Sequence, residues 1–136
     1  EEYFWIPHRG VHRGVGGIFY DHLENSSDAL FEQNFGLTRD VGEAFLDIFP
    51  KLVRRRMNME YTPEQKQAQR RWRGLYAEFN LVYDRGTTFG LKTGGNVDAI
   101  LMSLPPTTKW NYNAHAKPGT EEEITTNFLK KGIDWV

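Results

Sequence analysis

The residues best suited to do chemistry are Asp84 and Arg85, which follow directly on the run EFNLVY. A carboxylate accepts hydrogen bonds from N–H and O–H groups, and a guanidinium binds carboxylates and phosphates through a fixed fork of donors. At the end of a predicted strand, the two groups suit a pocket for a polar ligand. The alternative is a turn aspartate followed by a solvated arginine, and residue type alone leaves both interpretations open.

A second group of polar side chains lies in HRGVHRGVGG, residues 8–17. His8 and His12 are four residues apart, as are Arg9 and Arg13, so each pair shares a face of an extended or helical backbone. The two guanidiniums could hold carboxylates or phosphates, and two solvated arginines are the equal alternative. A metal needs three or four ligands of fixed geometry, and no third ligand follows the histidines at a suitable spacing. We therefore predict no metal site.

Several strands are expected to position these groups. Phe79, Leu81 and Tyr83 alternate with polar or smaller residues, which is typical of a strand. The glycines of residues 10–17 argue against a helix there and suit an extended chain. The strands predicted in this way cover Tyr3–Pro7, Val15–Tyr20, Tyr76–Asp84, Thr87–Thr93, Val97–Leu104 and Lys109–Tyr112. The third and fourth of these are expected to pair as a hairpin.

The helices are expected in the remaining segments. Apolar residues recur every three or four positions from residue 28 onward, with Gly36 and Gly42 as possible dividers and Pro50 as a kink or break. Thr62-Pro63-Glu64-Gln65 has the form of a capping box with proline at the first helical position. The helices predicted in this way cover residues 28–35, 38–56, 63–74 and 121–131.

Composition bounds the class of protein. At 136 residues we expect one domain, and a net charge of −1 does not favour nucleic acid as a partner. The chain contains no cysteine, which excludes disulfides and thiol catalysis. No apolar run approaches the roughly 18 residues of a membrane span. The chain does not begin with Met, and we expect a truncated or processed N-terminus.

Two long blocks carry a family resemblance: YFWIPHRGVHRGVGGIFYD and YAEFNLVYDRGTTFGLKTGG, the second followed by AILMSLPP. In this order they are similar to the C-terminal half of oxygen-dependent coproporphyrinogen III oxidase, over nearly all of the chain. The resemblance implies that residues 1–136 are the C-terminal part of a single domain of α+β class. Its flat antiparallel β-sheet would be flanked on both faces by α-helices. It also implies that the N-terminal half, with part of the sheet, is missing here.

The function implied by this resemblance is the oxidative decarboxylation of two propionates of coproporphyrinogen III to vinyl groups. The products are protoporphyrinogen IX, carbon dioxide and hydrogen peroxide, with molecular oxygen as co-substrate and no metal or organic cofactor. The protein would then supply orientation and charge to an electron-rich substrate. The compartment stays undecided between cytoplasm, which is favoured, and mitochondrion or plastid.

The resemblance also assigns roles to residues. Asp84, Arg85 and His8 are implied to be catalytic, with Asp84 accepting pyrrole N–H groups and Arg85 binding a propionate. A homodimer interface is implied within Tyr76–Tyr112. The implied substrate-binding residues are Arg9, Arg13, Gly94, Gly95 and Asn96. The alternative is a non-enzymatic fragment that serves only for dimerisation and anion binding.

Overall fold

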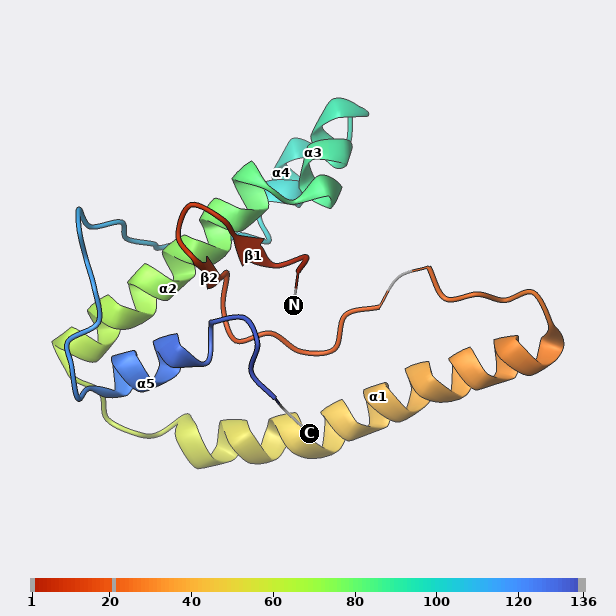
Figure 1. The fold of residues 1–136 in the computed structure, drawn as a ribbon, viewed down its shortest axis with the longest axis horizontal. Coiled ribbons are helices and arrows are strands. Elements are labelled where there is room, and N and C mark those ends of the chain that lie inside the picture. The colour runs from red at the N-terminus through yellow and green to blue at the C-terminus, as the bar shows by residue number, and fades with distance from the viewer. Residues whose placement is uncertain (1, 21, 135–136) are drawn as a thin grey trace. The chain divides into compact units, whose positions relative to one another are not determined.

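The computed structural model describes residues 2–20 and 22–134, which form two compact units. The first unit contains the residues up to Gly17 and those from Thr62 onward, and the second is Ile18–Tyr61. An antiparallel sheet and helices are both present, which confirms the α+β class (Figure 1). The elements are β1 (Trp5–Ile6), β2 (Val11–His12), α1 (Asp28–Arg56), α2 (Pro63–Val82), α3 (Arg85–Lys92), α4 (Val97–Leu101) and α5 (Glu121–Asn127).

The sheet of the first unit is a hairpin of β1 and β2, in which Trp5 pairs with His12 and Ile6 with Val11. Gly10 has a positive φ of 63° in the connecting turn, a conformation that glycine adopts without steric cost. Of the predicted strand Tyr3–Pro7, only Trp5 and Ile6 form a strand. The prediction of a strand at Val15–Tyr20 was wrong. The described chain offers this glycine-rich segment no neighbouring strand to supply ladder hydrogen bonds.

The core of the first unit lies between the hairpin and α2. Ile6 is fully buried, Phe79 is 2% exposed, and the rings of Tyr3 and Phe4 meet the ring of Phe79 at centroid distances of 5.9 and 5.7 Å. Leu129, which follows α5, is also buried and accepts a hydrogen bond from the His12 amide at 2.8 Å. The hairpin is thus held against α2 by a small, largely aromatic core.

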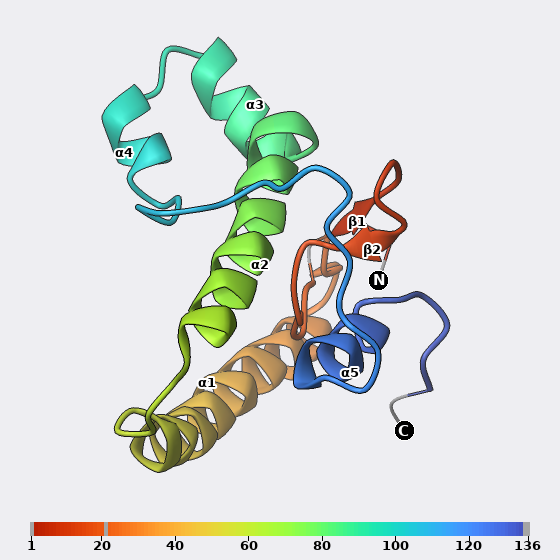
Figure 2. The ribbon, with the colours of Figure 1, turned by 90° about the vertical axis from the view of Figure 1, so that its left-hand side faces the viewer.

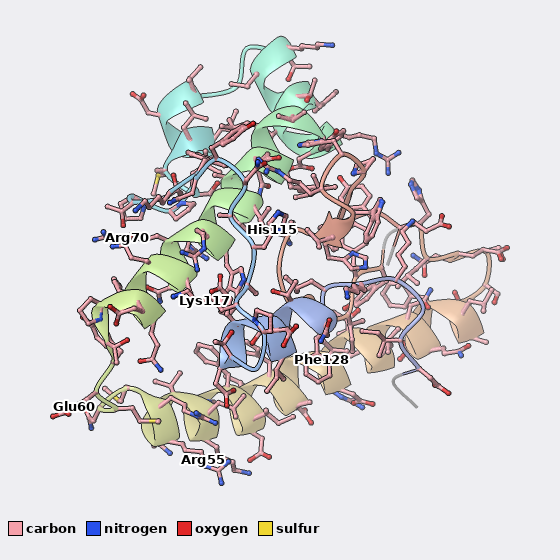
Figure 3. The ribbon with its side chains drawn as sticks, turned by 60° about the vertical axis from the view of Figure 1, so that its left-hand side comes forward. Arg55, Glu60, Arg70, His115, Lys117 and Phe128 are labelled. Carbon is pink, nitrogen blue, oxygen red and sulfur yellow. The ribbon has the colours of Figure 1, made fainter. Side chains whose placement is uncertain are left out.

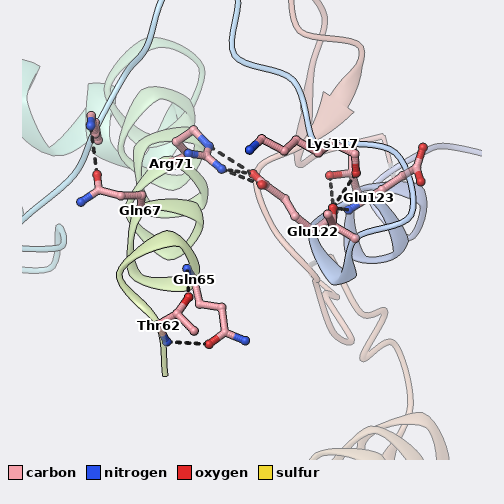
Figure 4. Close-up of polar contacts among 10 residues, drawn as sticks. Thr62, Gln65, Gln67, Arg71, Lys117, Glu122 and Glu123 are labelled. Carbon is pink, nitrogen blue, oxygen red and sulfur yellow. Dashed lines mark hydrogen bonds and ion pairs between the residues drawn. The ribbon is translucent and has the colours of Figure 1, made fainter. Parts of the chain in front are cut away.

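The start of α2 agrees with the sequence prediction. The Gln65 amide donates to the Thr62 hydroxyl at 3.2 Å, and the Thr62 amide donates to Gln65 Oε1 at 2.8 Å (Figure 4). The predicted end at Gly74 was wrong, because the helix continues to Val82. Gly74 is needed for packing instead, since a Cβ there would lie 2.8 Å from the Lys109 carbonyl oxygen.

Three further strand predictions were wrong: residues 76–84 lie mostly in α2, 87–93 in α3 and its C-cap, and 97–104 in α4 and the turn after it. In α2, Phe79 and Tyr83 are neighbours one helical turn apart, with ring centroids at 6.4 Å. A short alternating run thus also fits one face of a helix. Asp84 and Asn96 then act as N-caps, which start α3 and α4 where turns were expected (Figure 2).

The C-terminal part of the first unit begins with a long connection. The predicted strand Lys109–Tyr112 has no regular structure, and its chain is tied to α2 by the Lys109 amide, which donates to the Arg70 carbonyl at 3.1 Å. The connection, which includes His115 and Lys117, leads to α5 (Figure 3). Thr120 caps α5 as predicted, but the helix ends at Asn127 rather than near residue 131.

The second unit contains one helix where the sequence predicted two, at 28–35 and 38–56. α1 runs unbroken for 29 residues through Gly36, Gly42 and Pro50, with Ser27 as its N-cap. Glycine inside a helix costs only about 1 kcal/mol relative to alanine, so Gly36 does not divide it. None of its residues is buried. No helix in residues 2–20 and 22–134 has the length and apolar character that a membrane crossing needs.

Candidate functional site

The predicted site residue Asp84 lies between α2 and α3, where the first helix ends and the second begins. Its Oδ1 accepts the Tyr3 hydroxyl at 2.9 Å and the Gly86 amide at 3.1 Å. Its Oδ2 accepts the Thr87 hydroxyl at 2.9 Å and, more weakly, the Thr87 amide at 3.4 Å. The carboxylate therefore caps α3 and also anchors the N-terminal segment to the end of α2.

The next carboxylate along this side of α2 is Glu78, which binds the hairpin turn. Arg9 donates to it in bidentate fashion, from Nε to Oε1 at 2.9 Å and from Nη2 to Oε2 at 3.0 Å. Trp110 Nε1 also donates to Oε2 at 3.0 Å. His8 Nε2 contacts Oε1, and His8 Nδ1 lies 2.6 Å from the Tyr83 hydroxyl. Because a carboxylate only accepts, the His8 proton belongs on Nε2, and Nδ1 accepts from Tyr83.

Glu78 was missed by the sequence reasoning, although it joins two of the predicted site residues. Its side chain is only 10% exposed, next to the buried Phe79. A glutamate within the largely apolar and aromatic run YAEFNLVY was the available signal, because buried carboxylates are almost always paired. The prediction of a strand directed attention to the turn after this run and away from Glu78 itself.

The electrostatics of both carboxylates favour the ionised form. Burial alone would raise the pKa of Glu78, but hydrogen bonds from Arg9, His8 and Trp110, together with the Arg9 charge, hold it below the ordinary value. Burial likewise opposes ionisation of Asp84, and its bonds from Thr87, Tyr3 and the Gly86 amide bring that pKa below the usual range. Burial and the nearby Asp84 carboxylate raise the pKa of the Tyr3 hydroxyl.

The other two predicted arginines lie against aromatic rings. Arg85 Cζ is 5.1 Å from the centroid of the Tyr3 ring, next to Asp84. Arg13 Cζ is 4.1 Å from the Phe4 centroid and 4.7 Å from that of Tyr76. Such cation–π contacts hold a guanidinium in place while leaving its N–H donors available. Within residues 2–20 and 22–134, neither guanidinium forms an ion pair.

The predicted turn Gly94-Gly95-Asn96 is not brought to Asp84. It follows the C-terminal end of α3, about 12 Å along the helix from the Asp84 cap. Gly94 has a positive φ of 76°, and a Cβ on Gly95 would lie 2.8 Å from the Gly90 carbonyl oxygen. Asn96 accepts the Ala99 amide at 3.2 Å and caps α4. In this structure the turn serves the packing of α3 against α4.

The site therefore consists of two ionised carboxylates, a histidine between a carboxylate and a phenol, and an arginine near Asp84. Such a set can hold N–H donors and anions and can orient a proton on His8. Among the described residues, no group of three or more His, Asp or Glu side chains is arranged to hold a metal ion.

Comparison with known proteins gives one family. Residues 1–135 match the sequence profile of coproporphyrinogen III oxidase. The chain is 56% identical over 110 residues to a protein of Rickettsia bellii (strain OSU 85-389), a match that covers 81% of this chain and 38% of the relative. It is 57% identical over 111 residues to one of Rickettsia africae (strain ESF-5), covering 82% of this chain and 39% of the relative. Both are named oxygen-dependent coproporphyrinogen-III oxidase.

These relatives are much longer than the region of similarity, so the chain matches about two fifths of their length. The profile nevertheless extends over almost every residue and includes both polar groups described above. The chain belongs to the coproporphyrinogen III oxidase family.

Proposed function

We propose that the full-length protein that contains this chain converts coproporphyrinogen III to protoporphyrinogen IX with molecular oxygen. Each of two propionates loses its carboxylate as carbon dioxide, and the carbon next to the pyrrole ring loses a hydrogen with its electron pair. A vinyl group remains. Oxygen accepts the two electrons and two protons of each step and leaves as hydrogen peroxide, so the atoms balance without a further oxidant or reductant.

The observation that supports this proposal best is the hydrogen-bonding environment of Asp84. A tetrapyrrole carries pyrrole N–H donors at its centre and carboxylates at its edge. An ionised carboxylate can accept those N–H groups in place of its weakest bond, the 3.4 Å contact from the Thr87 amide, while the hydroxyls of Tyr3 and Thr87 fix its orientation. Negative charge at the ring centre would also stabilise the positive charge that develops as electrons leave the substrate.

Arg85 and Arg13 are the proposed partners of the substrate propionates. Each guanidinium lies over an aromatic ring and has no ion pair among the described residues, so both can take a carboxylate in bidentate fashion. Arg9 is already bound to Glu78, and we assign it to positioning the His8 turn next to bound substrate. It stays a prediction that the turn of Gly94, Gly95 and Asn96 contacts the substrate.

His8 is proposed as the proton carrier of the site. The Glu78 carboxylate fixes its Nε2–H, and the Tyr83 hydroxyl faces Nδ1. A histidine held in this way can accept a proton at Nδ1 while the Glu78 carboxylate stabilises the resulting charge.

Homodimer formation through residues 76–112 also remains a proposal, as does the assignment of residues 1–136 to one C-terminal part of a single domain.

The test is the stoichiometry of the full-length protein acting on coproporphyrinogen III prepared without oxygen. On admission of oxygen, we expect two oxygen molecules consumed, and two carbon dioxide and two hydrogen peroxide molecules released, per protoporphyrinogen IX formed. Binding of the substrate without any oxygen uptake would contradict the proposal and favour a module that only binds anions.

A further inference from the structure

A pocket of about 320 Å³ lies beside the middle of α2, away from the Asp84 end of that helix. Phe4, Trp72 and Tyr76 supply aromatic walls, and Arg13 and Arg73 supply the charge. All five residues belong to the first unit. Arg73 and Trp72 are assigned no role by the family resemblance or by the site described above.

The two guanidiniums of this pocket meet at one aromatic ring. Arg13 Cζ lies 4.7 Å and Arg73 Cζ 5.2 Å from the centroid of Tyr76. Two cations in contact with the same ring repel each other, and the ring offsets this only in part, since such contacts contribute roughly 0.5–1 kcal/mol at exposed sites. The arrangement therefore favours a bound anion.

Two nearby arginines, Arg9 and Arg71, are neutralised by carboxylates of the protein itself. Arg71 donates to both oxygens of Glu122, with Nη2 to Oε2 at 2.6 Å (Figure 4), and Arg9 is paired with Glu78. In residues 2–20 and 22–134, the guanidiniums of Arg13 and Arg73 have no acidic partner and no hydrogen bond. Arg13 and Arg73 thus line the pocket without a carboxylate partner, whereas Arg9 and Arg71 are bound to Glu78 and Glu122.

An aromatic row joins this pocket to Asp84. Asp84 accepts the Tyr3 hydroxyl, the Tyr3 ring meets the Phe4 ring at 5.0 Å, and the Phe4 ring carries Arg13 at 4.1 Å. Tyr3 and Phe4 are half-buried, so one side of this row faces outward. A flat ligand that lies along the row would meet a carboxylate at one end and two guanidiniums at the other.

We propose that Arg13 and Arg73 together form a carboxylate site that holds one peripheral propionate of the tetrapyrrole substrate. Trp72 and Tyr76 would contact the apolar edge next to that propionate. The identity of the ligand rests on the proposed function, whereas the existence of an anion site rests on the two unpaired guanidiniums. Arg73 would then determine specificity for a carboxylate at this edge of the ring.

The experiment measures binding of coproporphyrin III, the stable oxidised form with four carboxylates, to the full-length protein by fluorescence titration. Arg73→Gln should raise the Kd roughly tenfold, about the effect of one lost charge-assisted hydrogen bond. Arg73→Lys should restore only part of the affinity, since lysine lacks the fork. Arg55→Gln, which removes the same charge from exposed α1, is the matched control and should leave the Kd unchanged.

The outcomes separate this proposal from the proposed function. A raised Kd with Arg73→Gln, in a protein that binds the porphyrin but does not turn it over, supports the site and contradicts the activity. An unchanged Kd with normal turnover supports the activity and overturns the site. Arg73 is exposed, so circular dichroism should show the same fold for all three variants. Equal weakening by Arg55→Gln would reduce the effect to net charge and also overturn the site.

Discussion

Helices α1 and α2 are both long, yet they differ in what their side chains contact. α2 buries Ala68, Gly74, Ala77 and Phe79 and makes hydrogen bonds to residues far away in the sequence. None of the 29 residues of α1 is buried, and within the described part of the chain its side-chain hydrogen bonds and ion pairs join residues no more than ten positions apart. The polar groups proposed to act on substrate lie on or against α2, the helix that packs against other elements.

This difference matters because a functional side chain must be held within a fraction of an ångström to act. Glu78 is held by the hairpin turn and Trp110, and Asp84 by Tyr3 and Thr87. On α1, the charged pair of Asp47 and Lys51 is exposed and bridges a single helical turn. Such pairs contribute at most about 0.5 kcal/mol and position nothing else.

The largest expected effect on stability comes from the core of α2. Phe79→Ala should lower the free energy of unfolding of the 136-residue chain by about 3–5 kcal/mol, because it empties the buried space that the ring fills beside Tyr3 and Phe4. Phe45→Ala on α1, where the ring is 58% exposed, should cost less than about 1 kcal/mol. Urea unfolding measures the loss of stability in each variant. Equal losses would contradict the difference in packing between α1 and α2.

A smaller effect is expected from the polar contact between the hairpin and α2. Glu78→Gln keeps the side-chain shape but leaves Arg9 without its charged partner, and should cost about 1.5–3 kcal/mol. Glu43→Gln on α1 is the matched control, since Glu43 is exposed and 3.9 Å from Arg39. Its effect should stay below about 0.5 kcal/mol. A near-zero effect of Glu78→Gln would mean that the hairpin is held by its aromatic core alone.

The pH dependence should give the smallest effect. The folded-state pKa values of Asp84 and Glu78 are both depressed, so the unfolded chain binds more protons in the acidic range. Their contribution to stability is therefore complete above the unfolded values of about 4 and is lost as the pH falls through the folded values. The urea midpoint should fall on acidification, and less steeply for the double variant Asp84→Asn, Glu78→Gln. If the urea midpoint fell equally steeply with pH in the wild-type protein and in the double variant, the depressed pKa values of Asp84 and Glu78 would be contradicted.

The helix caps show what sequence could predict about the fold. Thr62 with Gln65, and Thr120 before three glutamates, start helices where expected, because capping is chemistry between residues three positions apart. The predicted strands failed because strands need partners far away in the sequence. Tyr76–Tyr83 fits a two-residue and a helical period, and only the packing of Phe79 under the hairpin decides between them.

The sequence led to some of the residues that the structure brings together, and their roles stay predictions. The resemblance led to Asp84, His8 and Arg9, and the structure places all three at the C-terminal half of α2 or against it. It does not bring Gly94–Asn96 to them. Glu78 was not predicted because its role depends on contact with a segment about seventy residues earlier in the chain. No local sequence pattern indicates such a contact.

The central claim is that the residues at the end of α2 carry the oxidative decarboxylation. Its most direct test is the turnover of two matched variants of the full-length protein. Asp84→Asn should lower kcat for coproporphyrinogen III by at least about a hundredfold, the scale of losing a main electrostatic contact. Asp47→Asn, the same change on α1, should leave kcat unchanged because, in residues 2–20 and 22–134, that exposed carboxylate pairs only with Lys51. Wild-type turnover by Asp84→Asn, or equal losses in both variants, would contradict the claim.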